Sequence, residues 1–210
     1  MKFENADKAF CYMYNYIKEN GIKVENTLAC FNQGFYIENP LDNEISTIWR
    51  NWKKDYAQYE WEWYLSGNPN AKEISKKAVI WKNHMDEKGN VRSNYGWQWL
   101  RENQLQKIID KLNNNKNTRQ AVLSIYDGKE INTYKFDTPC TLSIHFQIIE
   151  NKLCMTVNMR SNDLWFGFCN DQYCFSKLQE IVAQKLNIKI GWYYHFVNNL
   201  HLYERHFNIL

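Results

Sequence analysis

The sequence contains few of the residues that interrupt secondary structure, with only three Pro and eight Gly in 210 residues. It also lacks internal repeats, low-complexity blocks and long linkers, which excludes a repeat protein and a largely disordered chain. A chain of this length can bury a sizeable core. We therefore expect one domain that spans residues 1–210.

The sequence also lacks the signals of membrane insertion and secretion. No stretch reaches the roughly 18 apolar residues that a transmembrane helix needs. The first residues, MKFENADKAF, do not form the long apolar core of a signal peptide. The six cysteines form neither a CxxC pair nor a Cys/His zinc pattern. These absences predict a cytoplasmic protein with reduced thiols, no metal ion and no membrane partner.

The net charge is small, and a formal charge of +3 does not by itself indicate a nucleic-acid partner. A small anionic substrate would need only a few local Arg or Lys side chains. Aromatic residues, in contrast, make up 16% of the chain and include nine Trp. Most of them are expected to pack in the core or in an interface, although aromatic rings also stack on bases.

Apolar residues recur with a helical period in some segments and alternate or cluster as in strands in others. Helices are expected at residues 6–19, 45–65, 99–113 and 172–186, and strands at residues 121–126, 142–148, 153–159 and 189–197. Helices mixed with antiparallel strands predict an α+β domain in which helices are layered on a sheet.

The pair Glu150-Asn151 lies between two of these strands and indicates a hairpin turn. Cys140 precedes the first strand and Arg160 follows the second, so a tight antiparallel hairpin brings the two residues together. The positive charge of Arg160 would then favour the thiolate of Cys140, which is the nucleophilic form of cysteine. Taken alone, a Cys after Pro139 is more often a small buried residue.

Two acidic residues are candidates for chemistry. Glu60 lies among aromatic residues, and burial there would raise its pKa and suit it to proton transfer. The alternative is that Glu60 lies on the wet face of its helix. Asp171 lies near the expected start of a helix, where an acidic residue more often serves as a cap.

Two polar pairs are candidates for ligand binding. Arg160 and Ser161 could hold a phosphate through a fork of donors and a hydroxyl group, or could form a salt-bridged turn. His201 and Tyr203 would lie on the same side of a strand, where both could hydrogen-bond a sugar hydroxyl. Their alternative is a pair of half-buried residues with ordinary hydrogen bonds.

Taken together, these residues resemble the thymidylate synthase superfamily over residues 45–207. Each motif is weak alone, but five motifs in the family's order and spacing form a specific signal. The resemblance implies a thymidylate synthase-like fold and a homodimer that forms by sheet packing. The motifs are Pro139-Cys140, Arg160-Ser161-Asn162-Asp163 with Gly167, His201-Leu202-Tyr203, the segment from Glu60 to Gly67, and Asn94-Tyr95-Gly96 with Trp99.

The sequence departs from the synthases of this family at informative positions. Asp171 matches the position where synthases carry the Asn that reads uracil, and deoxycytidylate hydroxymethylases of the family carry Asp there. Thr141 follows the nucleophile where the synthases have His. The family's partner-donated Arg pair corresponds to Arg119-Gln120, and residues 31–40 contain no Arg. The resemblance therefore favours a cytidylate hydroxymethylase and puts the phosphate site in question.

The resemblance also implies a role for each candidate. The expected reaction converts a cytidylate into its 5-hydroxymethyl derivative with 5,10-methylenetetrahydrofolate and water, through a covalent bond between cysteine and C6. The catalytic residues would be Cys140, Glu60 and Asp171. The nucleotide would be held by Arg160, Ser161, Asn170, His201, Tyr203 and Arg119 of the partner subunit, and the folate by Asn162, Asp163, Gly167 and Trp81.

Two other functions stay open at this point. The first is a methylase or hydroxymethylase of uridylate, against which Asp171 argues. The second is a non-catalytic relative that binds nucleotides, which the missing phosphate cations favour. The sequence does not distinguish ribose from deoxyribose in the substrate.

Overall fold

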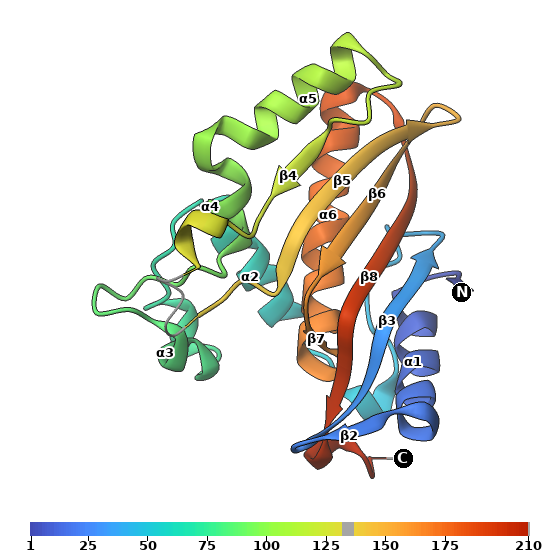
Figure 1. Cartoon of the computed structure of the whole chain (residues 1–210), viewed down its shortest axis with the longest axis vertical. Coiled ribbons are helices and arrows are strands. Elements are labelled where there is room, and N and C mark those ends of the chain that lie inside the picture. Colours follow the sequence, from blue (N-terminus) through green and yellow to red (C-terminus); the bar gives the residue numbers. More distant parts are fainter. Residues whose placement is uncertain (132–136, 210) are drawn as a thin grey trace.

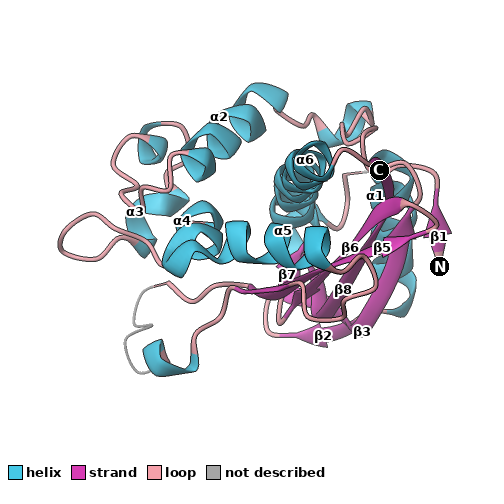
Figure 2. Ribbon diagram, turned by 90° about the horizontal axis from the view of Figure 1, so that it is seen from above, coloured by secondary structure: helices cyan, strands magenta, loops and turns pink. Residues whose placement is uncertain are grey.

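The computed structural model describes residues 1–131 and 137–209 (Figure 1). One layer is an eight-stranded sheet, and the helices lie on one side of it (Figure 2). The strands are β1 (Lys2–Phe3), β2 (Ile22–Val24), β3 (Thr27–Ile37), β4 (Val122–Ser124), β5 (Thr141–Ile149), β6 (Lys152–Met159), β7 (Asn162–Asp163) and β8 (Lys189–Tyr203). The helices are α1 (Ala6–Asn20), α2 (Lys54–Leu65), α3 (Ile80–His84), α4 (Tyr95–Leu100), α5 (Gln104–Asn114) and α6 (Cys169–Leu186).

The sheet is mixed, with the strand order β1-β3-β8-β6-β5-β4. Strands β5 and β6 pair antiparallel, as do β3 and β8. Strands β6 and β8 are parallel, because α6 connects them and returns the chain to the same end of the sheet. The prediction of an α+β class with helices layered on a mixed sheet is therefore confirmed.

The β5–β6 hairpin forms as the sequence predicts. Its turn residues Glu150 and Asn151 have φ values of 50° and 58°, the left-handed pair that a two-residue turn needs to match the twist of its strands. At the other end of the hairpin, the Arg160 amide donates to the Cys140 carbonyl oxygen at 2.8 Å. The predicted closeness of these two residues is thus confirmed.

The predicted helix over residues 45–65 is wrong in its first part. Regular helix begins only at Lys54, and a separate 3-10 turn covers Ile48–Arg50. Asn51 adopts a left-handed conformation with φ of 47°, which ends the turn. Ile48 is 92% exposed, so the apolar pattern that extended the prediction does not mark a buried face there. The Arg50 side chain is buried instead and donates from Nε to the Trp165 carbonyl oxygen at 2.8 Å.

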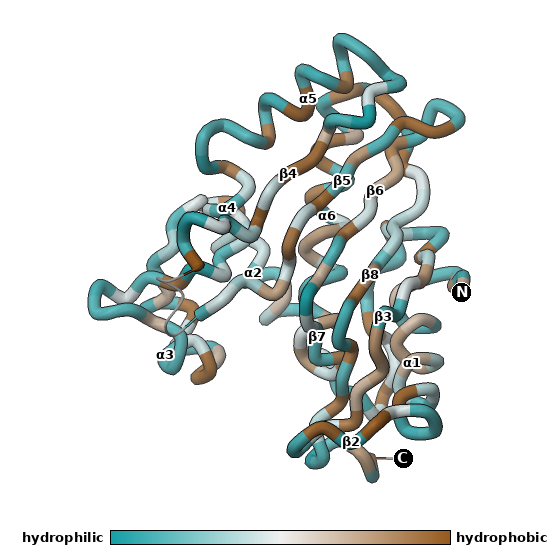
Figure 3. The backbone as a smooth tube through the Cα atoms, in the orientation of Figure 1, coloured by the Kyte–Doolittle hydropathy of each residue, from teal (hydrophilic) through white to brown (hydrophobic). Residues whose placement is uncertain are grey.

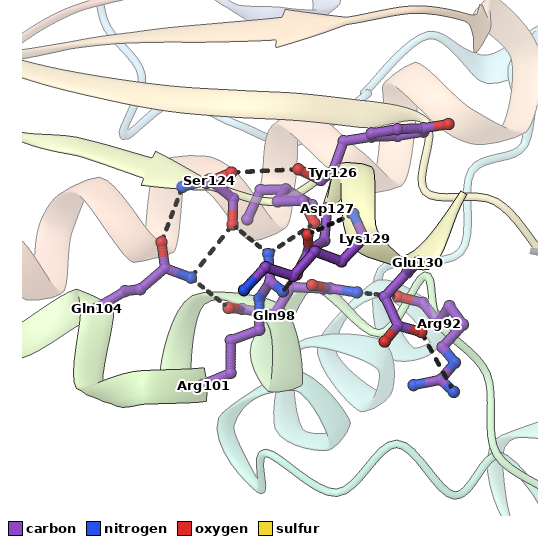
Figure 4. Close-up of polar contacts among 10 residues, drawn as sticks. Arg92, Gln98, Arg101, Gln104, Ser124, Tyr126, Asp127, Lys129 and Glu130 are labelled. Atoms are coloured by element: carbon purple, nitrogen blue, oxygen red, sulfur yellow. Dashed lines mark hydrogen bonds and ion pairs between the residues drawn. The ribbon is translucent and has the colours of Figure 1, made fainter. Parts of the chain in front are cut away.

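The predicted helix over residues 99–113 is also interrupted. Glu102 and Asn103 have left-handed φ values of 53° and 57°, which separate α4 from α5. The interruption brings polar side chains over β4 (Figure 4). Gln104 accepts a hydrogen bond from the Ser124 amide at 2.9 Å and donates to the Gln98 carbonyl oxygen at 3.0 Å. These contacts fix β4 against both helices.

Three further boundaries differ from the prediction. Strand β4 covers only Val122–Ser124, and α6 begins at Cys169 after a π-helical turn over Leu164–Phe168. Strand β8 continues to Tyr203, six residues beyond its predicted end at residue 197. Along β8 the buried positions shift by one residue between Val197 and Leu200. This shift places His201 and Tyr203 in the half-buried phase of the strand.

Strand β3 was not predicted, although it pairs with β8 along most of its length. Its polar centre breaks the alternation that marks a strand. Asn32 has a left-handed φ of 54° and accepts a hydrogen bond from the Asn198 side chain at 3.0 Å. Figure 3 shows that α5, in contrast, alternates polar and apolar positions, and its buried residues are Ile108, Ile109 and Leu112.

The structure also bears on membranes and metals. Within residues 1–131 and 137–209, no helix is long and apolar enough to cross a membrane. The same residues contain no group of three His, Cys, Asp or Glu side chains that could hold a metal ion. All six cysteines are free thiols.

Candidate active site

A cleft of about 510 Å³ opens where the β5–β6 hairpin ends beside α2, α3 and the first turn of α6. It collects twelve of the thirteen residues singled out in the sequence. They are Cys140, Glu60, Asp171, Arg160, Ser161, Asn170, His201, Tyr203, Asn162, Asp163, Gly167 and Trp81. Arg119, the thirteenth, lies at an exposed position between α5 and β4 and does not line the cleft.

Cys140 and Arg160 lie side by side at the open end of the hairpin. The Arg160 side chain donates to the carbonyl oxygens of Thr138 and Pro139 at 2.8 and 3.0 Å, and its Nη2 lies 3.8 Å from the Cys140 Sγ. These backbone contacts hold the cation against the sulfur. Burial nevertheless raises the pKa of Cys140 to about 11, an effect that Arg160 opposes and that Asp171 reinforces. In the free chain the sulfur is therefore a thiol at neutral pH.

Glu60 lies on the face of α2 that is turned into the cleft. Its Oε1 accepts a hydrogen bond from the Tyr64 hydroxyl at 2.8 Å, one helical turn further along. Its Oε2 is buried and has no hydrogen-bond partner among the described residues. Burial raises the pKa of Glu60 to about 7, while the hydrogen bond from Tyr64 and the nearby Tyr56 hydroxyl oppose the rise. A carboxyl group with this pKa and one open oxygen can exchange protons near neutral pH.

Asp171 lies in the first turn of α6, but it does not cap the helix. Its Oδ2 accepts a hydrogen bond from the Asn162 Nδ2 at 2.8 Å. Burial, followed by the nearby charge of Glu60, raises the pKa of Asp171 well above its usual range. The capping alternative is therefore not what the structure shows, and a half-buried carboxyl group faces the cleft instead.

Asp163 takes the capping role that Asp171 does not. Its two carboxylate oxygens accept from the amides of Trp165 and Phe166 at 2.9 and 3.2 Å, which begins the π-helical turn. Arg50 supports the same turn, because its guanidinium lies 5.0 Å from the centre of the Trp165 ring. Asp163 lines the cleft while both of its oxygens hold the backbone.

The other predicted ligand-binding residues occupy the rim and walls. The rings of His201 and Tyr203 are 5.3 Å apart and meet edge to face. Asn170 accepts from the Trp52 indole at 2.9 Å, and the Trp81 indole donates to the Tyr56 hydroxyl at 2.9 Å. These contacts orient four of the side chains that line the cleft.

Gly167 makes room in the cleft wall. A Cβ atom at this residue would lie 2.7 Å from the Asn162 Nδ2, closer than real Cβ contacts allow. The glycine thus lets the Asn162 amide approach the π-helical turn and reach Asp171. Gly167 therefore affects the site through Asn162. The sequence pattern did not indicate this link.

The cleft also contains residues that the sequence analysis missed. Tyr56 and Tyr64 flank Glu60 at four-residue spacing on α2, a signal that the helical period could have provided. His84 and Asp137 face each other at 3.9 Å across the mouth. They are far apart in the sequence, and no local pattern connects them.

Comparisons with known proteins agree on one family. The family model described as thymidylate synthase matches residues 25–210. The chain is 31% identical to the deoxycytidylate 5-hydroxymethyltransferase of Enterobacteria phage T4, over 92% of this chain and 81% of that protein. It is 27% identical to the thymidylate synthase of Bacillus mojavensis, over 88% and 69%. It is also 33% identical to the deoxyuridylate hydroxymethyltransferase of Pseudomonas phage M6, over 70% and 43%.

Proposed function

This chain belongs to the thymidylate synthase family, and from that premise we propose that it converts a cytidylate into 5-hydroxymethylcytidylate. As a member of the family it is an enzyme of one-carbon transfer to a pyrimidine nucleotide. The assignment of a cytidylate as the substrate rests on one observation. A half-buried carboxyl group with a raised pKa, that of Asp171, faces the cleft that holds Cys140, at the position where the family's synthases have an Asn.

A carboxyl group at this position suits cytosine because of the hydrogen-bonding groups on the ring. Cytosine carries an amino donor at C4 and an acceptor at N3. An ionised Asp171 accepts from the amino group, and a protonated one also donates to N3. Uracil presents an oxygen at C4, which an ionised carboxylate repels. The raised pKa of Asp171 therefore fits a group that shares a proton with the base.

In the proposed reaction the Cys140 thiol loses its proton to water, an ionisation that the charge of Arg160 favours, and the thiolate forms a bond to C6 of the ring. The electrons of the C5–C6 double bond then make C5 nucleophilic, which divides one difficult step into easier ones. Asp171 stabilises the charge that develops towards N3 and C4. C5 would then bond the one-carbon unit of methylenetetrahydrofolate. Glu60 takes the proton from C5, through water, as tetrahydrofolate would leave, and a methylene group remains on C5. After water has added to the new methylene group, the bond between sulfur and C6 breaks and restores the thiolate and the ring.

The one-carbon unit comes from 5,10-methylenetetrahydrofolate, the co-substrate that the family uses. The residues at the mouth of the cleft fit a flat ring system with polar edges. Trp81 and Phe166 supply aromatic surface, and Phe166 is 48% exposed. His84 and Asp137 supply polar groups beside them. Asn162, Asp163 and Gly167 form the wall between this mouth and the base-reading carboxyl group.

The phosphate and the sugar are assigned to the opposite wall. Arg160 and Ser161 would hold the phosphate, together with Arg119 of the partner subunit in a homodimer. His201 and Tyr203 would donate to the sugar hydroxyl. The half-buried rings of Tyr36 and Tyr194, 4.6 Å apart, point away from the helix-covered face of the sheet. This surface would pack against the same sheet of the partner.

A product assay tests the proposal directly. The chain is incubated with methylenetetrahydrofolate and dCMP, CMP or dUMP, and each product is identified by its mass. We expect 5-hydroxymethylcytidylate from dCMP or CMP and little product from dUMP. Conversion of dUMP alone would instead support a uridylate enzyme, for which the similarity to the phage M6 and Bacillus proteins is the evidence. Binding without turnover would indicate a non-catalytic relative.

A further inference from the structure

A chain of buried hydrogen bonds leads from the sheet to Asp171. The Tyr193 hydroxyl lies 2.7 Å from Nδ1 of His195, and Nε2 of His195 lies 3.1 Å from Oδ1 of Asn162. The Asn162 Nδ2 then donates to Asp171 at 2.8 Å. Tyr193 and His195 are completely buried, and Asn162 is 3% exposed. None of these contacts is needed to form the strand, because they involve side chains only.

The chemistry of the four groups sets the direction of every bond. Asp171 Oδ2 accepts from Asn162, so the amide must turn its NH₂ group towards Asp171 and its oxygen towards His195. That oxygen accepts only, so Nε2 of His195 must carry a proton. Nδ1 of the neutral ring is then bare and accepts from the Tyr193 hydroxyl. Burial also lowers the pKa of His195 to about 3, which keeps the ring neutral.

The space around Asn162 is consistent with one fixed orientation. Gly167 has no Cβ atom, and the Asn162 Nδ2 lies 2.7 Å from where a Cβ would be. A flipped amide would place Oδ1 against the Asp171 carboxyl group and NH₂ against the Nε2–H group of His195. With Asp171 ionised and Nε2 of His195 protonated, both contacts would then be repulsive, and nothing else among the described contacts of Asn162 would compensate.

We propose that His195 is a positioning residue that orients the Asn162 amide and thereby sets which oxygen of Asp171 is presented to the pyrimidine ring. Oδ2 is occupied by Asn162, so Oδ1 is the oxygen that reads the C4 substituent. His195 touches no substrate in this scheme and acts through Asn162. The inference rests on the proposed function, because it concerns discrimination between an amino group and an oxygen at C4.

The test compares variants at residue 195 with a matched control on the same strand. His195→Leu keeps a similar volume and removes the donor to Asn162. His195→Gln keeps a donor near the Nε2 position. Val197→Ala removes buried apolar volume on β8 without touching the hydrogen-bond chain. The value of kcat/KM is measured for dCMP and dUMP in each variant and in the wild-type chain.

We expect His195→Leu to lower the dCMP preference about tenfold or more, mainly through the KM for dCMP, because a buried hydrogen bond that orients the reader is lost. His195→Gln should restore the preference to within about threefold of wild type. Val197→Ala should lower thermal stability and leave the preference unchanged. A His195→Leu chain with wild-type preference, or a Val197→Ala chain with the same loss, would overturn the inference.

A second measurement is independent of turnover. Nitrogen NMR of the histidine rings in the wild-type chain should show one neutral ring protonated at Nε2, and its signals should be absent from His195→Gln. A ring protonated at Nδ1 would overturn the proposed bond directions. If His195→Leu does not fold, Tyr193→Phe replaces it. It removes only the donor to Nδ1 and should lower the dCMP preference by about threefold; an unchanged preference would count against the inference.

These outcomes separate the inference from the function on which it rests. Failure of the proposed function would appear in the wild-type chain, as absent turnover or as preference for dUMP, and would remove the base-reading role. The NMR result would still decide the orientation of Asn162. Failure of the inference alone would appear only in the variants, beside a wild-type chain that hydroxymethylates dCMP.

Discussion

The cleft contains two carboxyl groups with different hydrogen bonds: that of Glu60 on α2, which we call the floor of the cleft, and that of Asp163 at the start of the π-helical turn. Glu60 is buried and Asp163 is half-buried. In the turn, both oxygens of Asp163 accept backbone hydrogens from Trp165 and Phe166. On the floor, Glu60 has one hydrogen bond from Tyr64, and its second oxygen has no partner among the described residues. A buried polar group without a partner costs free energy. The comparison indicates that the turn is built for stability and the floor for chemistry.

The largest effect should come from replacing Cys140, the proposed nucleophile. Cys140→Ala should reduce turnover by about four orders of magnitude or more, because no other group can form the bond to C6. Thermal unfolding should change little, and binding of dCMP should persist. Cys30→Ala, at a buried thiol outside the cleft, is the control and should keep activity. Turnover by Cys140→Ala would rule out the covalent route.

Replacing Asp171, the proposed reader of the base, should change the choice of substrate. Asp171→Asn removes the charge and supplies an amide that can pair with the C4 oxygen and N3–H of uracil. We expect the ratio of kcat/KM for dCMP over dUMP to fall about a hundredfold, because donor and acceptor are exchanged in the two hydrogen bonds to C4 and N3 of the ring. The measurement is a competition assay with both nucleotides. An unchanged ratio would remove Asp171 as the reader of the base.

Replacing Glu60 should lower activity far more than stability. Glu60→Gln keeps the shape and the hydrogen bond from Tyr64 but cannot exchange a proton. We expect kcat to fall about 100- to 1,000-fold with little loss of stability, because general acid–base catalysis contributes an effect of that size. Single-turnover kinetics and thermal unfolding measure the two quantities. A large loss of stability with normal kcat would reverse the assignment of the floor.

The pH dependence of the free energy of unfolding should report the ionisation of Glu60. The pKa of Glu60 is raised from 4.5 to about 7 on folding, so the folded state binds a proton that the unfolded state releases between these values. The stability that this bound proton contributes is fully present below about pH 4.5 and is lost as the pH rises to about 7. The loss should approach about 3 kcal/mol at most. Comparing denaturant unfolding of the wild-type chain and Glu60→Gln from pH 5 to 8 isolates it, and parallel curves would contradict it.

The smallest effect should come from replacing Asp163, whose two carboxylate oxygens both accept hydrogen bonds. Asp163→Asn keeps one acceptor oxygen and loses the other, so one cap hydrogen bond disappears. We expect about 1 kcal/mol less stability and a smaller loss of kcat than in Glu60→Gln. Urea unfolding measures the first quantity, and the product assay measures the second. A loss of kcat as large as that of Glu60→Gln would end the distinction between the two regions.

Part of the site could be predicted because it depends on short-range geometry. The turn at Glu150 and Asn151 fixes the register of one hairpin, and that register brings Arg160 to Cys140. Spacing along α2 likewise places the tyrosines beside Glu60. The interrupted helices were not predictable in this way. The left-handed residues Asn51 and Glu102 interrupt them, and hydrophobic periodicity does not record such a change in backbone conformation.

The sequence by itself determined the elements whose residues are neighbours along the chain, including the hairpin, α1, α6 and the ordered motifs that identify the family. Only the tertiary structure decided the pKa values of the carboxyl and thiol groups in the cleft. Burial of Glu60, Cys140 and Asp171 comes from helices and strands that meet there from far apart in the chain. The same is true of the bonds that join His195 to Asn162. Desolvation and hydrogen bonding depend on the whole environment of a group, and that environment exists only after the chain has folded.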